Sequence, residues 1–173
     1  AGNDTYVFDT DALLGSDTIN EAGGGLDTLD FGQTTTRSVA INLANAVTQV
    51  INAGLTLTLS SATTLENIIG GSLADTLTGN SLDNVLTGGA GNDTYVFDTD
   101  GALGNDTINE SGGGIDLLDF SLTTTSSVAI NLANSVAQMV NAGLTLTLSS
   151  ATTLENVIGG SLADTLTGNS LDN

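Results

Sequence analysis

The chain has 173 residues, of which 20 are Asp or Glu and one is Lys or Arg, so its formal net charge is −19. This charge argues against nucleic acid and anionic membranes as partners, because both require a basic surface. Hydrophobic residues make up 39% of the chain, which is more than a permanently disordered acidic tail contains, so we expect it to fold. Cysteine is absent, and no apolar run is long enough for membrane insertion.

The sequence repeats itself after 89 residues. The segment Ala-Gly-Asn-Asp-Thr-Tyr-Val-Phe-Asp-Thr-Asp begins at Ala1 and again at Ala90, and the match continues to Asn84 and Asn173. We therefore divide the chain into a first copy, residues 1–89, and a second copy, residues 90–173, within one continuous solenoid. Every acidic residue of one copy has an identical counterpart in the other. We expect the two copies to be a window of a longer tandem array.

A nine-residue period lies inside each copy. Residues 88–96 match the pattern Gly-Gly-x-Gly-x-Asp-x-hydrophobic-x at every defined position. Consecutive frames along the chain place the following residues at the Asp position: Glu66 (61–69), Asp75 (70–78), Asn84 (79–87), Asp93 (88–96), Asp106 (101–109) and Asp116 (111–119). Each frame divides into a glycine-containing turn and a three-residue strand whose middle residue points inward. This pattern predicts an all-β, right-handed parallel β-roll solenoid.

Residues 31–65 and 120–154 contain no acidic residue. Their alternating apolar and polar residues predict strands, including one through Gln49 to Asn52. We interpret both stretches as metal-free coils that continue the same solenoid.

The frames predict two columns of acidic turns. Two frames per coil would stack Asp75, Asp93 and Asp116 along one edge and Glu66, Asn84 and Asp106 along the other. Carboxylates on strands about 4.8 Å apart would repel by about 3 kcal/mol at an effective dielectric near 20, so a cation is expected between them. Calcium fits, because it takes carboxylate and carbonyl oxygens in flexible geometry, whereas zinc or copper would need His or Cys.

These residues resemble the repeats-in-toxin, or haemolysin-type calcium-binding, family. The resemblance is strongest at residues 88–96 and 1–7, and Leu73 and Asn84 depart from the pattern. It implies a β-roll with Ca²⁺ between coils, export in an unfolded state by a bacterial type I system, and folding outside the cell. It also implies that Asp4, Asp75, Asp93 and Asp164 are calcium ligands.

We predict a wider ligand set from the frames and the copy-to-copy match. The pairs Asp9 with Asp11 and Asp98 with Asp100 have an alternative interpretation as solvated loops. The predicted metal ligands are Asp4, Asp17, Asp27, Asp75, Asp93, Asp98, Asp100, Asp106, Asp116 and Asp164.

The sequence favours a structural role without catalysis. With no His, no Cys and one Arg, the chain offers no nucleophile and base pair. We expect a calcium-binding repeat of a secreted or cell-surface bacterial protein, such as an adhesin, surface-layer component or filament. Expected partners are calcium ions, neighbouring copies of the chain, and a cell-surface or polysaccharide ligand. The alternatives are an accessory calcium roll of an exported enzyme, and binding of ice or polysaccharide through rows of Thr.

Overall fold

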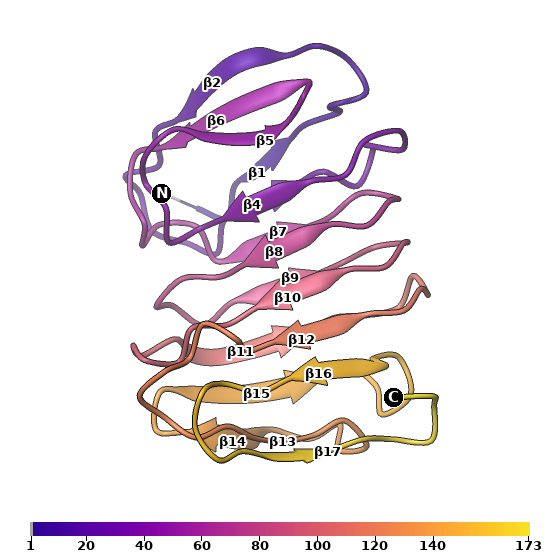
Figure 1. Ribbon diagram of the computed structural model, residues 1–173. Coiled ribbons are helices and arrows are strands. Elements are labelled where there is room, and N and C mark those ends of the chain that lie inside the picture. Colours follow the sequence, from indigo (N-terminus) through magenta and orange to yellow (C-terminus); the bar gives the residue numbers. More distant parts are fainter. Residues whose placement is uncertain (1) are drawn as a thin grey trace.

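The chain is wound into a stack of coils that runs from the N-terminus to the C-terminus, seen in a computed structural model that describes residues 2–173 (Figure 1). No helix occurs among these residues, and hence none that is long and apolar enough to span a membrane. The strands are β1 (Thr5–Val7), β2 (Gly15–Ile19), β3 (Thr28–Asp30), β4 (Ala40–Asn42), β5 (Gln49–Asn52), β6 (Leu55–Leu59), β7 (Asn67–Ile69), β8 (Thr76–Thr78), β9 (Val85–Thr87), β10 (Thr94–Val96), β11 (Gly104–Ile108), β12 (Leu117–Asp119), β13 (Ala129–Asn131), β14 (Gln138–Asn141), β15 (Leu144–Leu148), β16 (Asn156–Ile158) and β17 (Thr165–Thr167). The predicted all-β parallel β-roll is confirmed.

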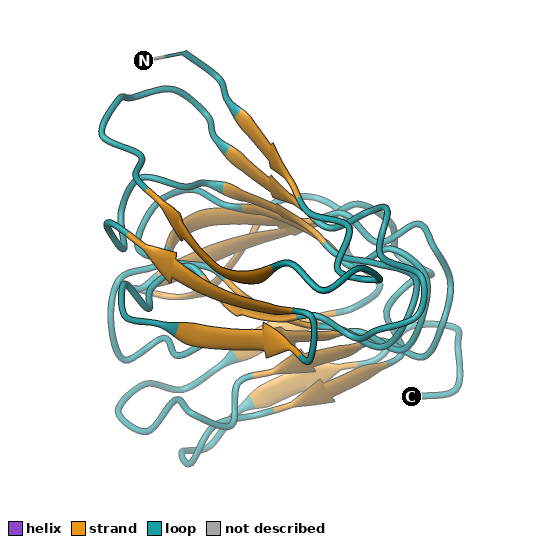
Figure 2. Cartoon of the chain, turned by 90° about the horizontal axis from the view of Figure 1, so that it is seen from above, coloured by secondary structure: helices purple, strands orange, loops and turns teal. Residues whose placement is uncertain are grey.

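The strands form two opposed layers joined by turns at both edges, as the view along the stack shows (Figure 2). One seven-stranded sheet has the order β1-β3-β7-β9-β11-β15-β14, and a five-stranded sheet has the order β16-β12-β10-β8-β4. From β7 to β12 the chain alternates between these two sheets strand by strand. Two nine-residue frames therefore make one coil, as the repeat predicts.

The core is a column of inward side chains, one from the middle of each short strand. Leu77, Leu86 and Tyr95 are each 0% exposed, and they come from β8, β9 and β10. Parallel pairing keeps these positions in line, with Leu77 opposite Tyr95 and Tyr95 opposite Leu118. The predicted three-residue strand with an inward middle residue is thus confirmed. The turns at the edges of the roll carry the polar groups.

The acid-free stretches depart from the regular winding. The strand expected through Gln49 to Asn52 is present as β5, but β5 pairs antiparallel with β6, and β14 likewise pairs antiparallel with β15. These stretches do continue the solenoid, because β4 pairs in parallel with β8 and β6 with β2, but each also contains an antiparallel hairpin that the sequence did not predict. The physical reason is the tight turn at Asn52-Ala53-Gly54, where Asn52 Oδ1 accepts the Gly54 amide at 2.9 Å and reverses the chain.

Equivalent strands of the two copies lie on opposite faces of the roll. In the first copy β1, β3 and β7 belong to the seven-stranded sheet, whereas their counterparts β10, β12 and β16 belong to the five-stranded sheet. The second copy is therefore related to the first by about half a turn around the stack as well as by a shift along it. Any surface feature of one copy recurs on the opposite face in the next.

Candidate metal centre

The acidic turns on one edge form a ladder in which each carboxylate binds the backbone of a neighbouring coil. The Asp75 amide donates to Asp93 Oδ1 at 2.8 Å, the Asp93 amide donates to Asp116 Oδ1 at 2.8 Å, and the Asp116 amide donates to Glu155 Oε2 at 2.8 Å. The predicted stacking of Asp75, Asp93 and Asp116 is confirmed. Asp93 and Asp116 each use one carboxylate oxygen for a backbone contact and keep the other without a partner, whereas Asp75 accepts backbone amides with both of its oxygens.

The opposite edge carries a second ladder with the same geometry. The Asp27 amide donates to Glu66 Oε2 at 2.7 Å, and the Asn84 amide donates to Asp106 Oδ1 at 2.9 Å. Asn84 Nδ2 donates to the Glu66 carbonyl at 2.9 Å, which joins the two pairs. Asn84 therefore acts as a neutral rung in an acidic column, and the predicted alignment of Glu66, Asn84 and Asp106 is confirmed.

Three carboxylates meet in the interior where the two copies join. Oxygens of Asp93, Glu110 and Asp116 lie within 4.8 Å of one another, and these residues are 1%, 2% and 0% exposed. Glu110 follows β11 and is held by the Tyr95 hydroxyl, which donates to Glu110 Oε2 at 2.6 Å. Among the described residues, Asp93 Oδ2 and Asp116 Oδ2 are buried without a hydrogen-bond partner. The cluster thus gathers three acids around two uncommitted oxygens.

Burial changes the protonation of this cluster. Desolvation raises the pKa of Asp93 to about 7, and the neighbouring charges of Asp75, Asp116 and Glu110 add to the rise. Desolvation also raises the pKa of Asp116 to about 6. The pKa of Tyr95 is raised by burial and by its hydrogen bond to Glu110, so its hydroxyl stays a proton donor. Without a cation, these two carboxyls therefore take up protons at a much higher pH than an ordinary aspartate does.

A glycine, and so no side chain, lies beside these oxygens. A Cβ atom on Gly88 would collide with Asp93 Oδ2, the Tyr95 hydroxyl and Glu110 Oε2, so only glycine fits this turn. The ligand set consists of oxygens alone, which suits a hard cation such as Ca²⁺. Two orphaned buried oxygens, an all-oxygen set and the glycine-lined space together fit a bound calcium ion.

The first copy repeats the cluster near the N-terminus. Oxygens of Asp4, Glu21 and Asp27 lie within 4.8 Å of one another, and the Tyr6 hydroxyl donates to Glu21 Oε2 at 2.6 Å. The hydrogen bond to Glu21 is the main cause that raises the pKa of Tyr6 to about 12, and the same bond lowers the pKa of Glu21. Asp4 is exposed, unlike its buried counterpart Asp93.

The predicted ligands fall into three groups in the structure. Asp4, Asp27, Asp93 and Asp116 converge in the two clusters. Asp75, Asp106 and Asp164 lie in the ladders, where each accepts a backbone amide from a neighbouring coil. Asp17, Asp98 and Asp100 are exposed and lie outside both clusters.

Asp100 uses both carboxylate oxygens for hydrogen bonds to the neighbouring coil. Its Oδ1 accepts the amides of Thr124 and Thr125 at 2.9 and 2.8 Å, and its Oδ2 accepts the Thr124 hydroxyl at 2.6 Å. These bonds lower the pKa of Asp100. Asp11 binds Thr35 and Thr36 in the same manner in the first copy. Both aspartates hold a loop of the next coil in place.

Sequence reasoning missed Glu21 and Glu110. Neither residue occupies the Asp position of a nine-residue frame, so the frame gave no reason to select them. The available signal was the tyrosine at the inward strand position, because a buried Tyr hydroxyl needs a hydrogen-bond acceptor. The tyrosines therefore indicated that an acceptor was needed, but the sequence alone did not say which residue supplies it.

The family comparison agrees with this geometry. Residues 9–142 match the family model described as peptidase M10 serralysin C terminal. The chain belongs to the serralysin C-terminal family. This family is the non-catalytic repeat region of serralysin-type proteases, a calcium-binding β-roll of the repeats-in-toxin type, and it occurs in proteins secreted by type I systems. No curated protein matches the chain significantly.

Membership in the serralysin C-terminal family identifies the ion. Its repeats bind Ca²⁺, and the acidic groups gathered in this chain are compatible with that ion. When bound, Ca²⁺ would supply positive charge between coils that carry only acids. Asp93, Glu110 and Asp116 are the residues placed to hold it in the second copy, and Asp4, Glu21 and Asp27 in the first.

Proposed function

We propose that this chain is a calcium-stabilised structural module of a secreted or cell-surface bacterial protein. The observation that carries the proposal is the pair of buried, unpartnered oxygens on Asp93 and Asp116, next to Glu110, in a sequence that has one basic residue. A buried carboxylate without a compensating charge destabilises the folded chain. An ion that binds there only in the folded state therefore raises the free energy of unfolding.

Calcium titration of the metal-stripped chain, followed by circular dichroism, tests the proposal. We expect strand content to rise with Ca²⁺ in the range of about 0.1 to 1 mM, which is usual for extracellular sites. The same titration with Mg²⁺ is the control, because its stricter octahedral geometry should give a much weaker response. Strand content that is full before any metal is added would contradict the proposal.

The role within a host protein has two candidates. Two nearly identical copies favour a periodic array, as in an adhesin, a surface layer or a filament, since length matters there more than a unique pocket. The family match favours an accessory roll attached to an exported protease. Refolding a serralysin-type catalytic domain with and without the folded chain distinguishes the two roles. A higher refolding yield in the presence of the chain supports the accessory role, and an unchanged yield supports the array.

The threonine rows give little support to ice or polysaccharide binding. Across neighbouring strands, Thr76 is followed by Thr94 and then by Leu117, so the hydroxyl column is interrupted. Thr56 pairs with Ser16 on a separate sheet. An ice-affinity assay on the folded chain would restore this alternative if the chain partitioned into ice.

Neighbouring copies of the chain are the protein partners that we propose. Leu77 is 0% exposed because β10 covers β8, whereas its counterpart Leu166 on the terminal strand β17 is 41% exposed. Residues 90–98, which form this cover inside the molecule, are identical to residues 1–9. The N-terminal coil of a second copy can therefore pack against β17 by the same pairing. Light scattering at saturating Ca²⁺ should show concentration-dependent oligomers, and strict monomers would contradict this.

A further inference from the structure

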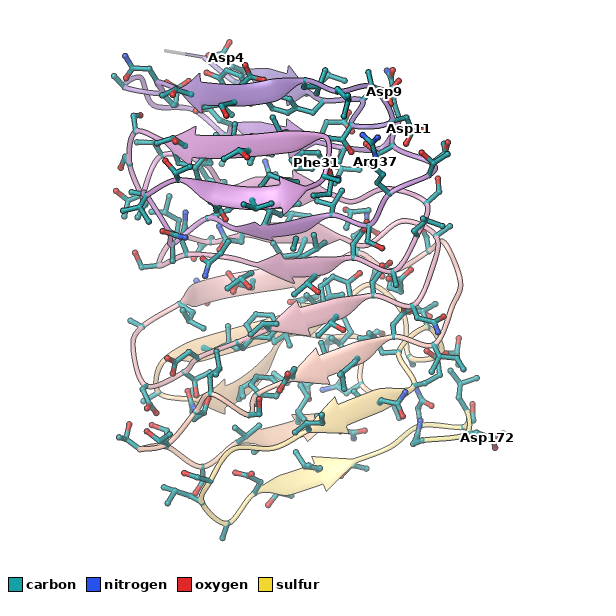
Figure 3. All side chains as sticks on the ribbon, turned by 45° about the horizontal axis from the view of Figure 1, so that its top comes forward. Asp4, Asp9, Asp11, Phe31, Arg37 and Asp172 are labelled. Atoms are coloured by element: carbon teal, nitrogen blue, oxygen red, sulfur yellow. The ribbon has the colours of Figure 1, made fainter. Side chains whose placement is uncertain are left out.

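Arg37 is the one basic residue of the sequence, and its guanidinium binds backbone carbonyls. Nη1 donates to the carbonyl oxygen of Thr10 and, at 3.0 Å, to that of Ala12. Figure 3 shows Arg37 beside the loop that carries Asp9 and Asp11. The first copy therefore places a fixed positive charge on two carbonyls of the loop that follows β1.

The second copy keeps the carbonyls and loses the cation. Thr99 and Gly101 take the places of Thr10 and Ala12, but Ser126 replaces Arg37. Serine carries no charge and is too short to reach as far as an arginine side chain does. The two copies thus differ by one charge at an otherwise matched position.

Gly54 lies in the turn between β5 and β6, and Gly143 takes the matching position between β14 and β15. In the first copy a Cβ atom on Gly54 would lie 2.5 Å from the Thr10 carbonyl oxygen and 2.8 Å from that of Ala12, and would overlap Arg37 Nη1. The first copy therefore holds a cationic nitrogen next to Gly54 and between two carbonyls.

In the second copy three oxygens surround the corresponding point. A Cβ atom on Gly143 would lie 2.6 Å from the Gly101 carbonyl oxygen, 3.2 Å from that of Thr99 and 3.4 Å from Asn141 Oδ1. No hydrogen bond reaches the carbonyl oxygens of Thr99 or Gly101 from within residues 2–173. Thr99 itself is 2% exposed, so its carbonyl has little bulk water to bind.

We propose that a Ca²⁺ ion binds next to Gly143 in the second copy, in the space that corresponds to the one the Arg37 guanidinium fills beside Gly54 in the first. The ligands are the carbonyl oxygens of Thr99 and Gly101 and Asn141 Oδ1, which also accepts the Gly143 amide at 2.9 Å. This is an all-oxygen set of the kind that Ca²⁺ accepts. Asp98 and Asp100 flank Thr99 in the sequence and make the local potential negative, which favours a cation over a neutral water. This site is separate from the carboxylate clusters.

The ion would fasten one hairpin of the second copy. Asn141 ends β14, and Gly143 precedes β15, so the ion joins this hairpin to the loop after β10. In the first copy Arg37 Nη1 lies against Gly54 of the β5–β6 hairpin without a metal. In the second copy the ion would add to the bonds that already join the hairpin to this loop, from Asn141 Nδ2 to Thr99 Oγ1 at 2.6 Å and from the Leu103 amide to the Gly143 carbonyl at 2.7 Å.

Two reciprocal substitutions test the site. Ser126→Arg supplies the guanidinium to the second copy, and Arg37→Ser removes it from the first. Equilibrium dialysis at millimolar Ca²⁺ should show that S126R binds one ion fewer than the unmodified chain and that R37S binds one more. The Tm without calcium should rise in S126R, because the guanidinium takes over the role of the ion.

A matched control separates the site from a general charge effect. Ser121→Arg adds the same charge at an exposed position, and its number of bound ions should equal that of the unmodified chain. If S126R and S121R bind equal numbers of ions, this site does not exist. A chain that binds no Ca²⁺ in any form would contradict the proposed function itself, whereas unchanged stoichiometry in S126R contradicts only this inference.

Discussion

At the scale of single residues, Asp93 shows how the ladder creates a demand for metal. Its Oδ1 accepts the Asp75 amide, while its Oδ2 points into the cluster without a donor among the described residues. An unsatisfied buried polar group costs about 1–3 kcal/mol, and more when it is charged. Backbone pairing therefore fixes the carboxylate in place, and the unpaired oxygen makes that position unfavourable until a cation arrives.

Asp93→Asn should separate these two effects. The amide oxygen can still accept the Asp75 amide, but the charge is removed, so the Tm without calcium should rise by about 5 °C. Calcium affinity at this cluster should fall at least about tenfold, because a ligand carboxylate is lost. Asp172→Asn, at an exposed position, is the control and should change neither quantity. A lower Tm for D93N in chelator would show that the orphaned charge is not destabilising.

The raised pKa values predict an unusual pH dependence for the metal-free chain. In the folded state the pKa values of Asp93 and Asp106 are about 7 and that of Asp116 is about 6, mainly through desolvation. Unfolded Asp has a pKa of about 3.9, so between about pH 4 and pH 7 the folded chain binds more protons. Stability without calcium should therefore rise as the pH falls from 7.5 to 5.

Calcium should reverse this trend. Bound Ca²⁺ requires ionised carboxylates, so the gain in Tm on adding calcium should be largest at pH 7.5 and should shrink toward pH 5. Thermal melts at both pH values, with and without calcium, provide the measurement. A metal-free Tm that falls on acidification to pH 5 would contradict the assignment of these buried carboxyls.

At the scale of elements, the sheets on one face are interrupted where β4 and β5 meet. Gln49 closes the gap: its Oε1 accepts the Asn42 amide at 3.0 Å, and its Nε2 donates to the Asn42 carbonyl at 3.0 Å. Gln138 makes the same two bonds to Asn131 in the second copy. The side-chain amide of each glutamine thus bonds the backbone amide and carbonyl that a neighbouring strand would otherwise bond.

Gln49→Glu should destabilise this junction. The change removes the donor to the Asn42 carbonyl and brings a carboxylate next to it, at a cost of about 1–3 kcal/mol. The fall in Tm should persist at saturating calcium, because the junction lies in the acid-free stretch. Gln33→Glu adds the same charge at an exposed position and should leave the Tm nearly unchanged. Equal Tm values for the two variants would show that the bridge is unimportant.

The elements also show what the sequence could and could not predict. The nine-residue frame predicted the short strands, the inward middle residues and the two acidic columns, because the period and the side-chain alternation are local. The β5–β6 reversal was missed, since alternation alone does not distinguish parallel from antiparallel pairing. Glu110 was missed because it enters the cluster through the Tyr95 hydroxyl, a contact between frames that no spacing rule contains.

At the scale of the whole molecule, the half-turn between copies decides which residues meet. Thr94 of β10 lies opposite Thr76 of β8, whereas Val85 belongs to β9 in the other sheet. The chain has no cysteine, so double substitutions can report this arrangement directly. Thr76→Cys with Thr94→Cys should form a disulfide on oxidation, because neighbouring strands bring Cα atoms within bonding range.

Val85→Cys with Thr94→Cys provides the contrast. If the second copy continued on the same face as the first, β10 would lie next to β9, and this second pair would oxidise instead. Comparison of the two variants by mass spectrometry under mild oxidation distinguishes the arrangements. Exclusive cross-linking of the second pair would contradict the half-turn.

The central claim is that calcium between acidic coils holds the roll together. Its most direct test is the thermal melt of the unmodified chain at pH 7.5, followed by circular dichroism, in excess calcium and in excess chelator. We predict a much lower Tm and reduced strand content in chelator, with both restored when calcium is added back. A chelated chain that kept its full strand content and the same Tm would contradict the claim.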